Sequence, residues 1–188
     1  MYLDTETENK HTHKRMRTHT RGSISMSNSS NLSVAVVIMS GLPGSGKSTW
    51  IKKHSKDETV CSADHFFMRD GEYCFNPSQL GEAHASCMRR FIDALSKGQN
   101  VIVDNTNLSW DEISPYYSVA KAFGAKVSLC TVECSMEVAH SRCVHGVPLV
   151  AYKGMQQRLR ERKIPPFVDM ECYIIGSEMG GDIPIKVK

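Results

Sequence analysis

Residues 41–48 read Gly-Leu-Pro-Gly-Ser-Gly-Lys-Ser, a complete G-x-x-x-x-G-K-[ST] phosphate loop. The segment from Leu32 to Met39 before it is almost entirely apolar or β-branched, which is typical of a buried strand. The residues after it, 49–53, continue as a helix. A phosphate loop needs this order of strand, loop and helix, so the sequence predicts a protein that binds a nucleoside triphosphate.

Each part of the loop has a chemical reason. Gly41, Gly44 and Gly46 allow turns that a Cβ would block, so backbone N–H groups point at the phosphates. Lys47 reaches the β- and γ-oxygens, and the Ser48 hydroxyl ligates Mg²⁺. The competing interpretation is a glycine-rich turn with no ligand. The expected ATP-binding residues are Gly41, Leu42, Pro43, Gly44, Ser45, Gly46, Lys47, Ser48 and Thr49.

Composition narrows the class of protein without naming a substrate. A chain of 188 residues is long enough for one α/β domain. A net charge of +3 and a pI near 8.5 are compatible with an anionic substrate and do not require one. Seven cysteines with no C-x-x-C pair indicate a reducing compartment, and those at 130, 134 and 143 fit no zinc spacing, so buried thiols are the preferred interpretation.

The longest apolar run is far shorter than a membrane span, and the acidic first ten residues are unlike a signal peptide. We therefore expect a cytosolic or nuclear protein without a membrane partner, as a monomer or weak oligomer. Residues 1–32 have almost no large apolar side chains and predict a disordered basic tail, followed by one domain over 33–188. The basic run at 10–21 is interpreted as a solvated segment, with nucleic-acid docking or nuclear import as the alternative; Met16 and Met26 are alternative starts.

From Val34 onward, apolar β-branched runs alternate with amphipathic stretches, which predicts a parallel sheet with crossover helices. The start of the third helix is open between a capping box formed by Ser109 and Glu112 and a later start at Ser114-Pro115. The expected strands are 34–39, 59–62, 101–103, 126–132 and 173–175, and the expected helices are 47–54, 78–97, 109–123, 135–143 and 149–163.

Polar residues follow the second and third predicted strands, where the active site of such a sheet gathers. Asp64 is the expected general base for a hydroxyl acceptor; the alternative is a cap for the turn at 65–67. Asp104 ends an apolar strand, as the acid of a Walker B motif does, and is expected with Ser48 at the Mg²⁺ site, where it would hold a Mg²⁺-bound water; the alternative is to orient an arginine. Asn105 and Asn107 either bind substrate or lock the loop.

Two sets of basic residues could also contact phosphate. Arg142 lies on the segment best placed to fold over ATP, where it would stabilise the transferring phosphoryl group; a surface arginine is the alternative. The basic residues at 153–163 include Arg158 and Arg162 on one helix face, interpreted as a solvated face, with phosphate contact as the alternative.

Taken together, these motifs resemble the kinase module of bacteriophage polynucleotide kinase, and more closely the P-loop module of the Nedd-four-binding protein two-like group. The resemblance covers about 34–162. It is carried by the stretches 41–50, 64–67, 71–77, 82–84, 103–108 and 145–148, together with Arg142.

The resemblance implies a three-layer P-loop NTPase fold, with a parallel five-stranded sheet in the order 2-3-1-4-5 and a helical lid. It also implies an ATP- and Mg²⁺-dependent kinase for the 5′-hydroxyl of DNA or RNA, with Asp64 as base and Arg142 as lid arginine. Phe67 replaces the substrate-holding arginine of the phage enzyme, so Arg69 is the nearest substitute, and His65 replaces a second acid. The alternatives are a kinase for a small molecule or nucleoside and a non-catalytic ATP-binding interaction module.

Overall fold

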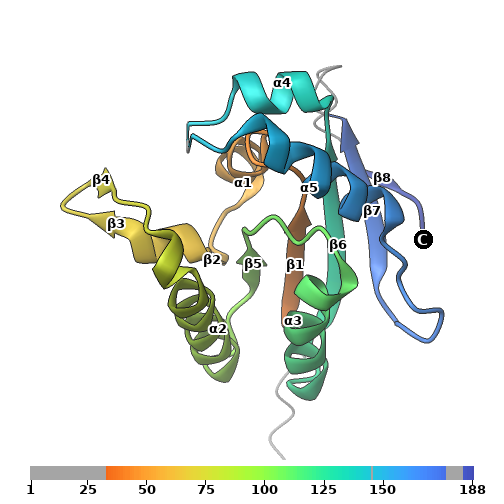
Figure 1. Cartoon of the computed structure of the whole chain (residues 1–188). Helices are drawn as coiled ribbons and strands as arrows, with labels where there is room; N and C mark the ends of the chain where they lie inside the picture. Colours follow the sequence, from red (N-terminus) through yellow and green to blue (C-terminus); the bar gives the residue numbers. More distant parts are fainter. Residues whose placement is uncertain (1–32, 145, 177–183) are drawn as a thin grey trace, which may run out of the picture. The chain divides into compact units, whose positions relative to one another are not determined.

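A mostly parallel β-sheet carries the fold (Figure 1). The computed structural model describes residues 33–144, 146–176 and 184–188, so the expected tail at 1–32 lies outside the described residues. The strands of this sheet are β1 (Ala35–Ser40), β2 (Thr59–Cys61), β5 (Val101–Val103), β6 (Lys126–Glu133), β7 (Glu171–Gly176) and β8 (Ile185–Lys186).

The strands lie side by side in the order β2-β5-β1-β6-β7-β8. β1 is central, with Val36 opposite Val101 of β5 and Val127 of β6. Counted along the chain, the first five strands stand in the order 2-3-1-4-5 and pair in parallel. The expectation of five strands is wrong by one, because β8 pairs antiparallel with β7. A two-residue strand after Pro184 is too short to show a period-2 pattern.

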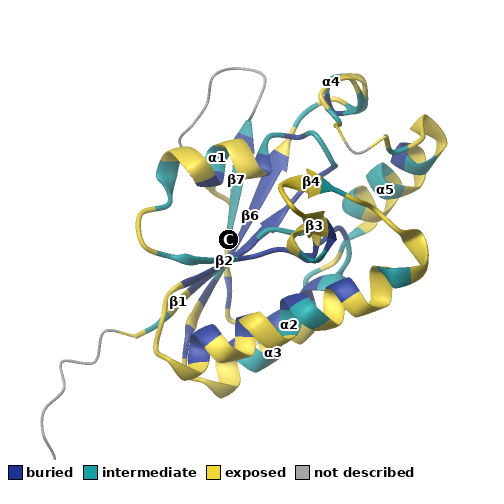
Figure 2. Ribbon diagram, turned by 90° about the vertical axis from the view of Figure 1, so that its left-hand side faces the viewer, coloured by how far each residue is buried: buried dark blue, intermediate teal, exposed yellow. Residues whose placement is uncertain are grey.

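Helices cover both faces of the sheet, with α1 on one side and α2 and α3 on the other (Figure 2). All five expected helices are present with ends shifted by at most two residues. They are α1 (Lys47–His54), α2 (Leu80–Ser96), α3 (Trp110–Ala122), α4 (Met136–Ser141) and α5 (Leu149–Glu161); two 3₁₀ helices, η1 (Ala63–Phe67) and η2 (Pro77–Gln79), precede α2.

The two faces of β1 serve two hydrophobic cores. Val36 and Ile38 pack toward α2 and α3, while Met39 packs with Ile51 of α1, because successive side chains of a strand point to opposite faces. In α2, the buried residues Ala83, Cys87, Phe91, Ala94 and Leu95 recur at helical spacing. The opposite face of α2 is exposed.

A third core joins α4 and α5 to the phosphate loop. Leu42, Leu108, Ala139 and Tyr152 are its buried members, and the Tyr152 hydroxyl donates to the Pro43 carbonyl over 2.9 Å. Both helices therefore rest directly on the loop. Across the described ranges, no helix is long and apolar enough to cross a membrane.

A small hairpin between η1 and η2 was not expected from the sequence. β3 (Met68–Arg69) and β4 (Glu72–Tyr73) pair across Asp70 and Gly71, whose φ angles are 51° and 86°. Two consecutive positive φ values are typical of a two-residue hairpin turn, and Asp-Gly is a strong sequence signal for it. The signal was present, but two-residue strands show no periodicity.

Helix α3 begins at the earlier of the two starts that the sequence left open. Its N-cap is Ser109, and Pro115 lies inside the helix. The capping box does not form: the Glu112 carboxylate accepts from the backbone N–H of Leu108 over 2.7 Å, and the Ser109 side chain caps nothing. The helix thus begins at the residue that the capping box predicted, but a different hydrogen bond, from Leu108 to Glu112, stabilises its start.

Candidate active site

The phosphate loop takes a conformation that its glycines alone allow. Gly41, Gly44 and Gly46 have φ angles of 142°, 76° and 104°. A Cβ on Gly41 would lie 2.6 Å from the carbonyl oxygen of Val132, and one on Gly44 would lie 2.1 Å from that of Ala139. The loop is thus pressed against β6 and α4, and no side chain fits at these two positions.

Lys47 closes the loop from inside. Its side chain is only 8% exposed, and its ammonium donates to the carbonyls of Gly41 and Leu42 over 3.0 Å each. Burial lowers the pKa of Lys47, and the nearby carboxylates of Asp104 and Asp64 raise it in part. The two carbonyl oxygens hold the ammonium in the loop, and a phosphate oxygen can take their place as its hydrogen-bond acceptor.

The start of α1 is open to an anion. The helix begins at Lys47 with no side-chain cap and no acid in its first turn. Its first backbone N–H groups therefore have no intrahelical acceptor, and they carry the positive end of the helix dipole. The Ser45 hydroxyl beside them is buried and has no hydrogen-bond partner among the described residues. These features fit the phosphates of ATP.

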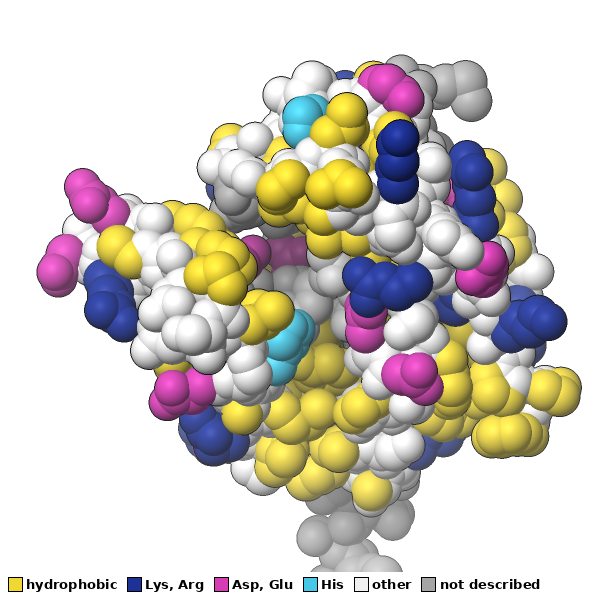
Figure 3. Space-filling model, viewed as in Figure 1, with side chains coloured by type: hydrophobic (Ala, Val, Ile, Leu, Met, Phe, Trp, Pro, Cys, Tyr) yellow, Lys and Arg dark blue, Asp and Glu magenta, His cyan; other side chains and the backbone are white. Residues whose placement is uncertain are grey.

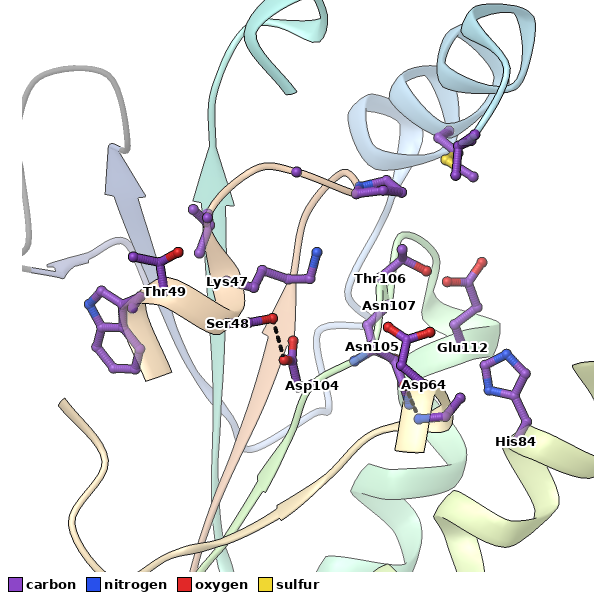
Figure 4. Close-up of a pocket in the computed structure, with 18 of the residues that line it drawn as sticks. Lys47, Ser48, Thr49, Asp64, His84, Asp104, Asn105, Thr106, Asn107 and Glu112 are labelled. Carbon is purple, nitrogen blue, oxygen red and sulfur yellow. Dashed lines mark hydrogen bonds between the residues drawn. The ribbon is translucent and has the colours of Figure 1, made fainter. Parts of the chain in front are cut away.

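Ser48 and Asp104 meet at the other end of the loop. The Ser48 hydroxyl donates to the Asp104 carboxylate over 2.7 Å (Figure 4). Burial raises the pKa of Asp104, opposed by this hydrogen bond and by the charge of Lys47. A hydroxyl and a carboxylate suit Mg²⁺, which takes most of its ligands from water and phosphate. No cluster of three acids, histidines or cysteines occurs in the described part of the chain.

The cysteines form no zinc site within that same part of the chain. None of the seven forms a disulfide among the described residues, and Cys61, Cys87 and Cys130 are buried while Cys74 is exposed. Burial raises the pKa of the Cys61 thiol to about 11. Of the three cysteines interpreted as buried thiols, Cys130 is buried, whereas Cys134 and Cys143 are only partly buried.

Asp64 lies in η1, just after β2. Ser62 caps this turn, because its hydroxyl accepts from the Asp64 backbone N–H over 3.2 Å. The Asp64 side chain is therefore not needed as a cap; it is exposed and accepts a hydrogen bond from the Tyr73 hydroxyl over 2.8 Å. The carboxylate is free to act on a ligand.

The two asparagines of the next strand end differ in role. The Asn105 side-chain oxygen accepts from the backbone N–H of Ala63 over 2.9 Å, and its amide donates to the Tyr116 hydroxyl over 3.1 Å. It therefore ties the residue before Asp64 to α3. Asn107 is buried with φ 44°, and it donates to the Met39 carbonyl over 2.7 Å. Both side chains therefore make hydrogen bonds of the kind that hold a loop in a fixed conformation.

A cavity of about 1130 Å³ joins these groups (Figure 3). We call one side the P-loop wall (Pro43, Gly44, Gly46, Lys47, Ser48 and Thr49). We call the other the hairpin wall (Asp64, Tyr73, Phe75, Leu80, His84 and Met88). Figure 4 shows Lys47 and Ser48 on one side and Asp64 and His84 on the other.

Of the two arginines expected to contact substrate or phosphate, one lines the cavity and the other does not. Arg142 follows α4, is exposed and lines the cavity. Arg69 lies in β3 and is not among the residues that line it, while Phe67 is buried. The expectation that Arg69 substitutes for a substrate-holding arginine therefore has no support in the geometry.

Two basic residues of α5 and its end are held by neighbours. Arg158 pairs with Glu112 over 2.6 Å, and the partly buried guanidinium of Arg162 donates to Ser40 over 2.6 Å and to Thr131 over 2.9 Å. The interpretation of this segment as a solvated face is wrong for Arg162; Arg158 is exposed, although its guanidinium is in an ion pair. The interpretation rested on helical spacing, which does not show the strand ends packed beneath the chain.

Comparison with known proteins gives the family. The sequence profile of the AAA_33 family, described as an AAA domain, matches residues 36–145, more than half of the chain. The chain belongs to the AAA_33 family. The match includes the phosphate loop, Asp64, Asp104 and Arg142. The resemblance to P-loop kinases is thus confirmed at the level of family and fold.

Two curated proteins have sequences similar to part of this chain. NEDD4-binding protein 2 of Homo sapiens is 36% identical over 98 residues, 50% of this chain and 6% of that protein. "Putative bifunctional polynucleotide phosphatase/kinase" of Acanthamoeba polyphaga mimivirus is 30% identical over 86 residues, 46% of this chain and 17% of that protein. The similarity thus spans less than a fifth of either relative.

Solved structures share the fold. A chain of the Pnkp1/Rnl/Hen1 RNA repair complex has a TM-score of 0.59 and 22% identity over 71% of this chain and 46% of its own length. A sugar kinase from Janibacter sp. HTCC2649 has a TM-score of 0.50 and 16% identity over 77% of this chain and 86% of its own. The AAA_33 chain therefore has a P-loop kinase fold, which proteins with different acceptors share.

Proposed function

We propose that this protein is an ATP- and Mg²⁺-dependent kinase that transfers the γ-phosphate to the 5′-hydroxyl of a polynucleotide. One observation carries the proposal. A carboxylate with no capping duty, Asp64, lies across a single cavity from a phosphate loop that retains Lys47 and the Ser48–Asp104 pair. A phosphoryl transfer to an alcohol needs a base opposite the triphosphate.

The residues divide the reaction between them. Asp64 accepts the proton of the attacking 5′-hydroxyl while that oxygen forms the new bond to the γ-phosphorus, and the bond to the β-phosphate oxygen breaks to release ADP. Lys47 and Arg142 stabilise the negative charge of the transferring group. Ser48 and Asp104 would hold Mg²⁺, which neutralises phosphate charge when bound. The polynucleotide acceptor is supported by the name of the viral relative.

A small hydroxylated molecule is the second candidate acceptor. Asp111 and Glu112 of α3 also line the cavity, and their carboxylates repel a chain of phosphates. Because Glu112 is paired with Arg158, most of this repulsion comes from Asp111. An acceptor assay must therefore include free nucleosides and sugars.

The test is transfer of labelled phosphate from ATP to 5′-hydroxyl DNA, 5′-hydroxyl RNA, nucleosides and sugars. We expect labelled oligonucleotides, and a loss of about 100- to 10,000-fold in kcat for Asp64→Asn with ATP binding retained. Asp70→Asn is the matched control, because Asp70 is exposed, lies outside the cavity and has a positive φ that Asn tolerates.

Each other outcome removes one part of the proposal. Label on small molecules alone would contradict the proposed polynucleotide acceptor. Full activity in Asp64→Asn would contradict the role of Asp64 as the base. ATP binding without transfer to any acceptor would indicate a non-catalytic ATP-binding module.

A further inference from the structure

The hairpin wall presents a rigid aromatic pair. Tyr73 ends β4, and Phe75 follows two residues later. Their rings are nearly parallel, at 8° with centroids 6.3 Å apart, and the buried ring of Phe67 contacts both by its edge. Support from a buried ring holds the pair in place.

This pair lies beside the candidate base. The Tyr73 hydroxyl donates to the Asp64 carboxylate over 2.8 Å, and both rings line the cavity. Phe75 is 48% exposed, a large share for a phenylalanine beside a catalytic site. Any acceptor whose hydroxyl reaches Asp64 must place its neighbouring atoms against these rings.

The part of the hairpin wall that α2 contributes is also largely apolar. Leu80, His84 and Met88 are spaced by four residues along α2 and all line the cavity; Leu80 and His84 are exposed, and Met88 is partly buried beside the core stripe of this helix. Figure 3 shows hydrophobic side chains gathered along the hollow on this side. The rings and these α2 side chains together suit a flat, apolar group.

Charge argues against phosphate as the group that contacts the hairpin wall. Asp64 and Asp111 line the cavity, and Arg158, which also lines it, is paired with Glu112. Among the described cavity residues, Lys47, Lys53 and Arg142 belong to the phosphate loop, α1 and the end of α4. The hairpin wall therefore offers stacking surface and little positive charge.

We infer that the rings of Tyr73 and Phe75 form a stacking platform for the 5′-terminal base of the acceptor strand. The inference rests on the proposed polynucleotide acceptor. The attacking 5′-oxygen and the base are carried by the same sugar, so a hydroxyl at Asp64 brings the base to the adjacent rings. Stacking accepts every base, so the platform selects for a terminal nucleotide without selecting its sequence.

The test uses an oligonucleotide with the fluorescent adenine analogue 2-aminopurine at its 5′ end, whose emission is quenched when it stacks. We expect quenching on binding to the wild type and to Phe75→Trp, and its loss in Phe75→Leu. Leucine keeps the contact with Phe67 but has no π face. The KM for the 5′-hydroxyl strand should rise about 10-fold in Phe75→Leu, with the KM for ATP unchanged.

Two controls isolate the base. An acceptor with an abasic 5′ residue should be used equally by the wild type and Phe75→Leu. Phe123→Leu removes another exposed phenylalanine, outside the cavity, and should behave as the wild type. Equal quenching by Phe75→Leu, or equal quenching with the probe at the third residue, overturns the platform.

The two proposals fail separately. Phosphate transfer to the strand without quenching in the wild type keeps the proposed function and overturns the platform. Quenching that depends on Phe75 without phosphate transfer keeps the platform and overturns the kinase. A strand that is neither phosphorylated nor quenched overturns both.

Discussion

The P-loop wall and the hairpin wall of one cavity are built by different means. The P-loop wall consists of backbone groups in a conformation fixed by glycines, closed by a lysine that is only 8% exposed. The hairpin wall consists of side chains from η1, the hairpin and α2, several of them exposed. The first wall tolerates no change of shape, whereas the second changes its chemistry with each side chain.

Under the proposed function, the difference follows from what each wall binds. A triphosphate is the same in every ATP-dependent kinase, so a fixed cradle of N–H groups serves all of them. Acceptors differ, and the residues that contact them lie on short connections between rigid elements. Substitutions in the two walls should therefore have effects of different size and kind.

Among three further substitutions that compare the two walls, the largest effect is expected from Gly44→Ala in the P-loop wall. The new Cβ would lie 2.1 Å from the Ala139 carbonyl oxygen, so the loop or α4 must move. ATP affinity should fall by about 100-fold or more, because the charge-assisted hydrogen bonds of the loop lose their geometry. Calorimetric titration with ATP measures the change.

Gly98→Ala is the matched control for this loss. Gly98 has a similar φ of 69°, but a Cβ added there would meet none of the described residues within 4 Å. Both variants carry the left-handed strain of about 1–2 kcal/mol, and only Gly44→Ala adds the clash. Equal ATP affinity in the two variants would show that the cradle is less rigid than its contacts indicate.

An intermediate effect is expected from Asp104→Asn, where binding and stability should change in opposite directions. The variant should lower Mg²⁺-dependent activity by about 10- to 100-fold. Burial raises the pKa of Asp104, so its stabilising contribution is present at low pH and lost as the pH rises through the raised value. Without nucleotide, the variant should therefore melt a few degrees higher at neutral pH.

Thermal unfolding of both proteins from acidic to neutral pH tests the sign. The difference in melting temperature should shrink on acidification, as the wild-type carboxyl becomes neutral. A variant that is less stable than the wild type at neutral pH would show that the attraction between Asp104 and Lys47 outweighs the cost of burial.

The smallest effect is expected from Tyr73→Phe in the hairpin wall. The ring remains, but the hydrogen bond to Asp64 is lost. We expect kcat to fall about fivefold, the size of a partly exposed hydrogen bond to a charged group, with the KM for the acceptor unchanged. Steady-state kinetics with 5′-hydroxyl strands measures both constants.

Tyr173→Phe is the control, because Tyr173 makes the same kind of bond to Glu171 over 2.8 Å and does not line the cavity. If Tyr73→Phe changes KM and leaves kcat unchanged, the hydroxyl belongs to the binding surface and does not position the base.

The sequence predicted the elements that have strong periodicity and missed the ones that do not. Strand β5 and helix α1 have the expected bounds, since an apolar run and a phosphate loop define them. The hairpin and β8 consist of two-residue strands, which carry no pattern. The hairpin nevertheless had a turn signal in Asp70-Gly71, and it carries Tyr73, which sequence reasoning did not select as a site residue.

Local sequence by itself determined the turns of the P-loop wall. They depend on glycines and a lysine within eight consecutive residues, so a motif predicts them, while packing against β6 and α4 holds the loop in place. Tertiary structure decided the hairpin wall, because Asp64, Tyr73 and His84 come from η1, β4 and α2 and meet only when the chain folds. It also decided Arg162, which the helical pattern placed at the surface and which the structure shows partly buried against the strand ends. A spacing motif describes neighbours along the chain, whereas side chains that meet across elements are set by packing.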